Sequence, residues 1–444
     1  MRWALDQLAR EAPNRKSWQE YRAGNQPTIL PTERIPVRFI NLFHRYRKNL
    51  APRVVANVTD RLHVEGWTVD GEQAQATADE VWWQSAGDTL QQRVHDDALT
   101  TGDAFVLVWP DEDGTPRVWE HPCTSVTVTY DDRDEIAAAA KVWQEPDGTW
   151  RLTEYLPDQI IRWRADGQQS SSLPSADAWT AHDADDEPHE DTNPFGEVPW
   201  AHFPSPDGRS ILEDVAPLQD QLNLLSLAMI YATAEHALPP RWVIGAQPVI
   251  DPETGRKEPP FHADDRIWGQ PPGEQGETRS FGQFEPGDIR QIQELRSATV
   301  DDVAEVTGQP AWTLRMPTGE WPSGEALRSA LGPLVKQVEW LQRFWKPAWS
   351  RVMRLALLQA GHSDAQPDPV WADVVQITDE QRWARVQQLL DLGFPLGMAL
   401  KRGAGWTQDQ VDELLAAQAD DDQRLGQELR RAATNGGDPA ALLA

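Results

Sequence analysis

The chain has 444 residues, enough for about two to four compact units, and its 41 lysines and arginines against 70 aspartates and glutamates give a formal net charge of −29. Because a protein that holds nucleic acid by neutralising phosphates is normally basic, this charge disfavours tight DNA binding. The single cysteine, Cys123, excludes an intrachain disulfide framework, and the lack of an N-terminal apolar segment or an apolar run of about 18 residues predicts a soluble chain without a standard secretion signal.

The first hundred residues carry helical patterns. Residues 1–30 are polar and contain proline, which predicts an N-terminal arm with a short helix over residues 1–11. Residues 32–63 and 77–100 predict two further helices. The first of these holds the densest basic patch of the chain, His44-Arg45-Tyr46-Arg47-Lys48 together with Arg53. This patch is either a solvated helix face or a contact surface for an acidic chain or DNA.

From residue 104 the period of the pattern changes to two, which predicts a series of short β-strands. Asp113-Gly114 and Asp147-Gly148 are expected to form tight turns, and with the preceding helices the strands predict an antiparallel meander in an α+β unit. In the loop that follows, the acidic run 182–191 is expected to be solvated rather than to bind a metal, because a flexible loop lacks a rigid ligand frame. The expected strands are 104–109, 117–119, 125–130, 137–143, 150–156 and 159–163.

Two helices are expected in the middle of the chain. The first covers residues 210–238, where apolar residues recur at three- and four-residue steps and polar residues interrupt them, so it is not a membrane span. The second covers residues 288–307, with Asp288 as a plausible N-cap, and Gly308 and Pro310 end it.

A long insertion rich in proline, glycine and charge separates these two helices. Such a length is unusual for a connection inside a compact domain, so the insertion is either a small protruding module, a partner-binding element or a disordered surface segment. Residues 241–245 and 265–268 have the pattern of short strands, which favours the module.

An exposed loop, residues 312–322, and a long helix beginning at Ser323 and ending at Gly361 come next. Pro333 and Pro347 remove backbone donors inside this helix, so it is expected to be kinked or broken there. A small helical region follows, in which two capping boxes, 378–381 and 407–410, open helices over 380–392 and 411–419 after a linker at 365–370 and before a frayed tail from about residue 420.

Recognisable catalytic motifs are missing from the sequence. It contains no phosphate-binding loop, so by that test the chain is not an ATP-driven motor. It also contains no cysteine and histidine cluster, no zinc-protease motif and no nucleophile elbow. We therefore expect no enzymatic activity, no cofactor and no metal.

The order of these elements resembles the portal proteins of tailed bacteriophages, specifically the SPP1-type group. The resemblance rests on two helices around a projecting module, a tight loop and a kinked long helix, and it covers about residues 30–420. It also includes the segments 41–50, 62–67, 101–109 and 196–200, the last of which leads into 208–212.

The resemblance implies a portal fold made of named parts. They are an N-terminal arm (1–30), an α/β wing (31–209), a first stem helix (210–238), a small α/β clip (239–287), a second stem helix (288–308), a tunnel loop (309–322), a long kinked wing helix (323–362), a helical crown (363–420) and a flexible tail (421–444).

The resemblance also implies a structural function. The chain is expected to form a ring of about twelve copies at one capsid vertex, through which double-stranded DNA is packaged and ejected without sequence specificity. Its implied partners are the major capsid and scaffolding proteins, the terminase large subunit and a head-to-tail adaptor, with no membrane. Its implied location is the virion, and the host cytoplasm during assembly.

Position alone selects the candidate site residues. In the tunnel loop they are Arg315, Met316, Thr318 and Trp321, and in the clip they are Arg256, Lys257 and Trp268. Each of these could equally be an ordinary exposed loop residue. The other interpretations of the whole chain are a different phage head or neck protein, or a divergent nuclease.

Overall fold

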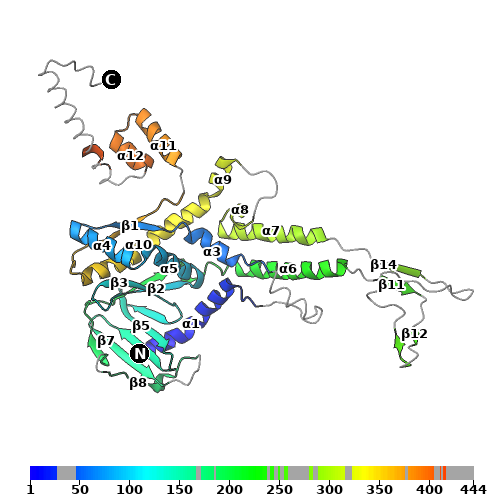
Figure 1. The fold of residues 1–444 in the computed structure, drawn as a ribbon, viewed down its shortest axis with the longest axis horizontal. Helices are drawn as coiled ribbons and strands as arrows, with labels where there is room; N and C mark the ends of the chain where they lie inside the picture. The colour runs from blue at the N-terminus through cyan, green and yellow to red at the C-terminus, as the bar shows by residue number, and fades with distance from the viewer. Residues whose placement is uncertain are drawn as a thin grey trace, which may run out of the picture. The chain divides into compact units, whose positions relative to one another are not determined.

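The computed structural model describes residues 1–27, 47–166, 172–184, 187–237, 241–244, 249–250, 255–258, 280–283, 289–315, 323–375, 379–404, 411 and 414–416. They belong to two compact units, Met1–Val374 and Val375–Ala444. The first unit combines antiparallel sheets with helices, as Figure 1 shows, so the expected α+β class is confirmed.

The two largest sheets of the first unit are antiparallel. One has the order β10-β2-β3 and the other the order β4-β5-β6-β7-β8, with β9 also pairing with β7. Their strands are β2 (Asp103–Pro110), β3 (Pro116–His121), β4 (Val126–Tyr130), β5 (Ile136–Gln144), β6 (Trp150–Tyr155), β7 (Gln159–Ala165), β8 (Trp179–Ala181), β9 (Glu190–Thr192) and β10 (Trp200–Pro204).

All six strands expected from the alternating pattern are confirmed, and so are the two turns, where Gly114 and Gly148 have φ of +82° and +94°. The expectation of one continuous meander was wrong. A turn over residues 122–125 carries the chain from β3 into a second sheet, because β4 pairs with β5 and not with β3.

Strand β2 lies between two cores, and its alternation shows this directly. Ala104, Val106 and Val108 belong to the main core with the helices, whereas Phe105 and Leu107 belong to a second core with β4, β5 and β7. A strand buried on both faces explains why the run 104–108 is apolar throughout. Cys123 also lies in the second core, fully buried, which confirms it as a small core residue.

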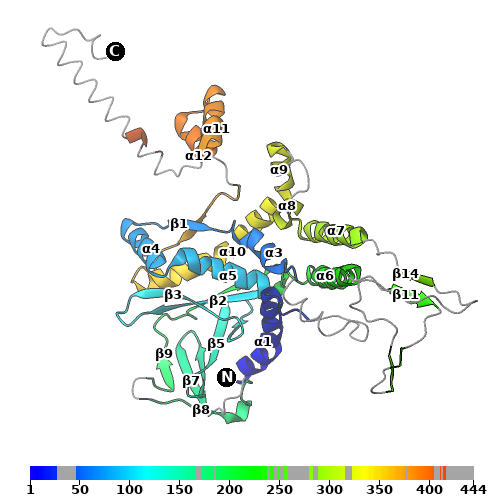
Figure 2. The same cartoon turned by 45° about the vertical axis from the view of Figure 1, so that its right-hand side comes forward.

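Helices cover the other face of the three-stranded sheet. Figures 1 and 2 show α5 (Gly87–Thr101) and α10 (Gly332–Gln359) against β2 and β3, with α4 (Glu72–Gln84) against β3, and α3 (Ala51–Thr59) contacts α5 and α10. The single helix expected over 77–100 was wrong.

The break between α4 and α5 has a packing cause. Ala86 adopts a left-handed conformation with φ of +51°, and the next residue, Gly87, lies directly against the indole of Trp82. A Cβ on Gly87 would lie 2.2 Å from that ring, so only glycine fits. Trp82 thereby folds α5 back beside α4 instead of extending it.

The long helix after Ser323 is broken at one proline and continuous at the other. It consists of α9 (Gly324–Ala330) and α10, which starts anew just before Pro333, where a missing N–H costs no helical bond. At Pro347 the helix continues, so of the two expected outcomes, a kink or a break, the break does not occur there. The side-chain oxygen of Ser323 accepts a hydrogen bond from the Ala326 N–H and caps α9, as expected.

Tryptophans of α10 fill the main core. Trp345 and Trp349 are fully buried, and both rings contact His95. The Trp345 ring stacks on His95 at 5.0 Å between centroids, and the Trp349 ring is perpendicular to it at 5.6 Å. Trp349 Nε1 donates to His95 Nε2 at 3.0 Å, and Trp345 Nε1 donates to the Pro204 carbonyl at 2.7 Å. Burial lowers the pKa of His95 to about 3, so the ring is neutral and can accept this bond.

The N-terminal residues are part of the fold, and the prediction of an arm with a short helix was wrong. Helix α1 spans Arg2–Ala23, and its Leu5 and Leu8 pack with residues of β5, β6 and β8. At its other end the Tyr21 hydroxyl donates to the Ala216 carbonyl at 2.7 Å and to Asp220 at 2.9 Å. Helix α1 therefore braces the second sheet against the helix that begins at Ala216.

The first unit extends further than the sequence indicated. Residues 368–371, expected in a linker, form strand β15 (Asp368–Trp371), which pairs antiparallel with β1 (Val64–Thr68). Pro369 is buried in this pair, and the unit ends at Val374 rather than near residue 362.

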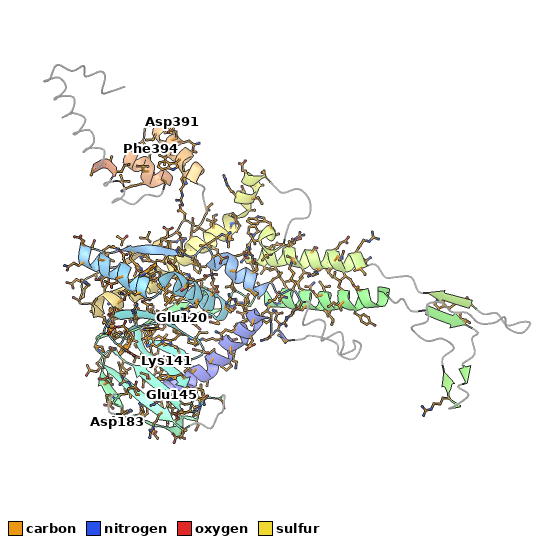
Figure 3. All side chains as sticks on the ribbon, viewed as in Figure 1. Glu120, Lys141, Glu145, Asp183, Asp391 and Phe394 are labelled. Atoms are coloured by element: carbon orange, nitrogen blue, oxygen red, sulfur yellow. The ribbon has the colours of Figure 1, made fainter. Side chains whose placement is uncertain are left out.

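The second unit is small and helical. It contains α11 (Asp379–Asp391), close to the expected helix, and α12 (Leu396–Ala404), which was not expected. Val386, Leu400 and Val411 form its core, and Asp391 and Phe394 mark the turn between the helices in Figure 3. The capping boxes at 378–381 and 407–410 include residues outside the described ones.

Asp97 of α5 gives a pH-dependent prediction. Burial and the charge of Glu120, labelled in Figure 3, raise its pKa from 3.8 to about 6. The folded chain thus holds this proton more tightly than the unfolded chain, so stability falls as the pH rises from about 4 to about 6. We expect Asp97→Asn to raise the free energy of unfolding by about 1–3 kcal/mol at pH 8, and the gain to vanish below about pH 4.

The neighbouring Asp96 is the matched control, measured by urea unfolding at both pH values. Its carboxylate accepts from Arg22 at 2.7 Å and from Thr59 at 2.9 Å. Asp96→Asn should therefore destabilise the chain at pH 8. If both substitutions changed the free energy of unfolding in the same direction at pH 8, burial would not be the cause of the raised Asp97 pKa.

Candidate stem and loop site

Two long helices form the centre of the candidate site. Helix α6 (Ala216–Ala237) and helix α7 (Ile289–Thr307) run side by side in both views of the fold. Helix α6 begins six residues later than expected, because residues 211–215 form turns that place Leu212 and Val215 in the main core. Helix α7 matches its expected range, and Asp288 lies outside the described residues.

Polar residues within α6 attach the start of the helix pair to the first unit. Gln219 accepts from the Leu50 N–H at 2.8 Å and donates to the Lys48 carbonyl at 3.0 Å. Asn223 donates to Gln26 at 2.7 Å, and both of these amide side chains are buried. The polar interruptions of the first helix are therefore explained by buried hydrogen bonds that fix its base.

A second buried polar cluster fixes the end of α7. Asn57 of α3 donates to Gln309 at 2.6 Å and to the Thr313 hydroxyl at 2.9 Å. Thr313 lies in the short helix α8 (Ala311–Leu314), and the Arg53 Nε donates to its carbonyl at 3.1 Å. Gly308, with φ of +64°, ends α7 and lets the chain enter this cluster.

Arg315 is the one predicted loop residue that the structure describes. It leaves α8 and forms two hydrogen bonds to the Asp301 carboxylate of α7, 2.9 Å from Nε and 2.8 Å from Nη2. The side chain is 31% exposed, so it is held by α7 and not extended freely from a loop. Met316, Thr318 and Trp321 lie outside the described residues.

The Arg315 ion pair should fix the start of the loop more than it stabilises the chain. Because both side chains are partly exposed, we expect Arg315→Ala and Asp301→Ala each to cost about 1 kcal/mol or less. A double-mutant cycle by urea unfolding should give a coupling of about 0.5–1 kcal/mol, since the geometry is bidentate. If the losses in the free energy of unfolding of the two single variants simply summed to that of the double variant, the pairing would be contradicted.

An open pocket of about 360 Å³ lies beside this pair and gathers three cations. Lys48, Arg296 and Arg315 line it together with Met229 and Val300, among others. Burial, followed by the charges of Arg296 and Arg315, lowers the pKa of Lys48. The basic patch predicted around Lys48 thus meets cations from α7 and α8, whereas its residues 44–46 lie outside the described ones. Arg296 was not among the site residues predicted from the sequence. A cation on a helix face that is otherwise mostly apolar was the signal that could have indicated it.

The clip is described only in part. Strand β11 (Arg241–Ile244) matches the strand expected over 241–245, and it pairs with β14 (Ser280–Gln283). Strand β12 (Val249–Ile250) pairs with β13 (Lys257–Glu258). Arg256 is exposed beside β13, and Lys257 lies in that strand. Trp268 and the strand expected over 265–268 fall outside the described residues.

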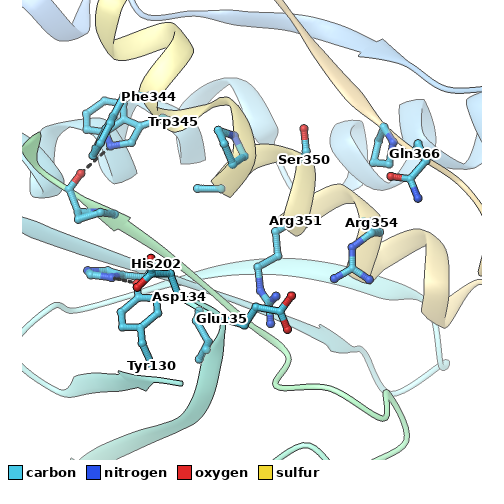
Figure 4. A pocket seen from close by; sticks show the side chains of 15 residues that line it. Tyr130, Asp134, Glu135, His202, Phe344, Trp345, Ser350, Arg351, Arg354 and Gln366 are labelled. Carbon is cyan, nitrogen blue, oxygen red and sulfur yellow. Dashed lines mark hydrogen bonds between the residues drawn. The ribbon is translucent and has the colours of Figure 1, made fainter. Parts of the chain in front are cut away.

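A larger pocket of about 520 Å³ lies between α10 and the sheets, and Figure 4 shows its side chains. Its cations are bound within the chain. Arg354 donates to Glu197 at 2.6 and 2.5 Å, and Arg351 donates to the Trp200 and Val198 carbonyls at 2.9 Å each. The two arginines of this pocket therefore join the helix to the sheet and its neighbouring loop and are already engaged within the chain.

Neither a metal-binding cluster nor a membrane-spanning helix occurs in the part of the chain that the structure describes. There, no group of three or more histidine, cysteine, aspartate or glutamate side chains is placed to hold a metal ion. Within the same residues, none of the helices is both long and apolar enough to cross a bilayer. His182, from the acidic run, is buried and hydrogen-bonded to Arg151.

Comparison with known proteins identifies the class. The family model for "Phage portal protein, SPP1 Gp6-like" matches residues 10–421, and the chain belongs to this family. The portal proteins of Mycobacterium phages D29 and L5 are each 25% identical to it over 352 residues, which cover 72% of this chain and 68% of each relative. The family is structural rather than enzymatic, and it gives the chain a role at the portal vertex of the virion, in an oligomeric assembly with other head components.

Solved structures also match the chain. The neck of a native GTA particle, computed with C12 symmetry, matches with a TM-score of 0.45 and 14% identity over 86% of this chain and 93% of that chain. The virion of a native gene transfer agent particle matches with a TM-score of 0.40 and 15% identity over 86% of this chain and 99% of that one.

Proposed function

We propose that about twelve copies of this chain form a closed ring whose channel is lined by α6 and α7, and that double-stranded DNA passes through it in both directions. The observation that carries this proposal is the helix pair itself. Both of its helices are fixed at one end by buried amide clusters around Gln219 and Asn57. A rigid base leaves the exposed sides of the pair available to neighbouring copies and to the channel.

The charge of the chain suits a conduit. Twelve copies would carry about −350 charges, ignoring bound ions, and an acidic wall repels phosphate and lowers sticking. In this proposal the tunnel-loop residues Arg315, Met316, Thr318 and Trp321 lie nearest the DNA. Because Arg315 is paired with Asp301, it would position the loop rather than grip DNA strongly.

The finer partners belong to the same proposal. The clip, with Arg256, Lys257 and Trp268, would first dock the terminase large subunit and later a head-to-tail adaptor. The wing would contact the major capsid and scaffolding proteins. Assembly would take place in the host cytoplasm, before the finished ring becomes part of the virion.

Negative-stain electron microscopy with mass photometry tests the proposal. We expect rings about 100–200 Å across with a central hole, a size set by packing about a dozen domains of this length side by side. Monomers or dimers that persist at high protein concentration and in the presence of scaffolding and capsid protein would contradict it.

A further inference from the structure

The helix α7 presents different chemistry on its two flanks. The pocket flank carries Gln293, Arg296 and Ser297, and it adjoins Lys48. Among the described residues, neither Arg296 nor Lys48 forms an ion pair, whereas Arg315 is already paired with Asp301. Two cations that repel each other and Arg315 across one pocket are stabilised most by an anion from outside the chain.

The opposite flank of α7 carries an anion in an apolar stripe. Leu295, Asp302 and Val306 follow one another at steps of seven and four residues, so they lie on the same side of the helix. Leu295 is 49% exposed and Val306 54%, and Asp302 is exposed between them. Within the part of the chain that the structure describes, Asp302 forms no ion pair.

We propose that the Leu295–Asp302–Val306 stripe of one copy docks on the pocket flank of the next copy, with the Asp302 carboxylate between Lys48 and Arg296. The chemistry of the two flanks is complementary, since the pocket offers two unpaired cations beside the apolar Met229 and Val300. The contact joins two different flanks of the same helix, so it is heterologous and can close into a ring. This inference rests on the proposed ring and assigns one contact within it.

Charge exchange tests the contact in the full chain. We expect Arg296→Glu and Asp302→Lys each to raise the protein concentration at half-maximal ring assembly about tenfold or more, measured by mass photometry. The double variant, which restores opposite charges in exchanged positions, should assemble within about threefold of the wild type. Glu294→Lys is the matched control, because this exposed residue on α7 lies between the two flanks; it should assemble as the wild type does.

Cross-linking gives a readout that does not depend on affinity. Arg296→Cys and Asp302→Cys chains, mixed and treated with a short bismaleimide, should give covalent dimers, whereas each variant alone should not. The native Cys123 is buried and should not react. Replacing Asp302→Cys by Glu294→Cys in the mixture should abolish the dimers. Thermal melts of the Asp302 and Glu294 variants should match the wild type, since these two side chains are exposed.

Different failures have different meanings. If wild-type rings form and the single charge reversals leave assembly unchanged, this contact is overturned and the proposed ring is not. If Arg296→Glu rings assemble normally but retain less of a short double-stranded DNA fragment, the pocket faces DNA and the contact is likewise overturned. If the wild-type chain forms no ring under any condition, the proposed function fails, and this contact with it.

Discussion

Replacing Arg15 by alanine is expected to lower the free energy of unfolding by about 3–5 kcal/mol, because it leaves a carboxylate and two carbonyls without their buried donor. The Arg15 side chain is 5% exposed and donates to Asp103 at 2.9 Å. It also donates to the Cys123 and Val126 carbonyls at 2.9 and 3.1 Å, and to Glu11 at 2.8 Å. One side chain thus joins α1 to the turn between the two sheets.

The measurement is urea unfolding followed by circular dichroism at pH 7. Arg10→Ala is the control, because Arg10 lies on the same helix but is exposed, and it should cost less than about 0.5 kcal/mol. Burial raises the pKa of Asp103, but its bonds to His202 and Arg15 more than offset this and lower the pKa below 3.8. The Asp103 contribution should therefore be present above about pH 4 and fade in stronger acid. An Arg15→Ala chain as stable as Arg10→Ala would show that α1 is not fixed at this point.

The arm prediction failed for the reason that Arg15 illustrates. Helix α1 is rich in charge and contains Pro13, so its sequence has the composition of a solvated segment. Its attachment depends on Leu5, Leu8 and the buried Arg15, whose partners outside α1 lie 88 to 111 residues away in the sequence. A local pattern cannot show such long-range pairs, whereas β2 was predictable because a short apolar run is a local signal.

The candidate site likewise has features that the local sequence predicts and contacts that only the fold reveals. The C-terminal end of α7 followed from Gly308 and Pro310, whose effects on the backbone are local. The pairing of Arg315 with Asp301 joins two segments. From the sequence, Arg315 was expected in a loop, and Asp301 lay on a helix face without a signal for a partner. The cationic pocket needed Lys48 and Arg296 to meet from segments far apart in the chain, so only the fold could bring it out.

Replacing Trp349 by alanine is the second large effect we expect, with a loss of about 3–5 kcal/mol in the free energy of unfolding. Trp349 is fully buried and makes edge-to-face contacts with Trp82 at 5.5 Å and with Phe203 at 4.7 Å between ring centroids. Its indole N–H is the donor to His95, so truncation creates a cavity and also removes the partner of a buried acceptor. Trp349→Phe should cost about 1–3 kcal/mol, since it keeps most of the volume but loses that bond.

Trp340 on the same helix is the matched control for this truncation. It is 44% exposed, and among the described residues its ring contact is with Phe344, stacked at 5.3 Å between centroids. Trp340→Ala should therefore cost about 1 kcal/mol or less in the unassembled chain, measured by the same urea unfolding. Equal losses for Trp340 and Trp349 would mean that α10 is not held by its buried face. Unequal losses would show that the buried Trp349 stabilises the fold, and would leave the exposed Trp340 and Phe344 free to be tested for effects on assembly alone.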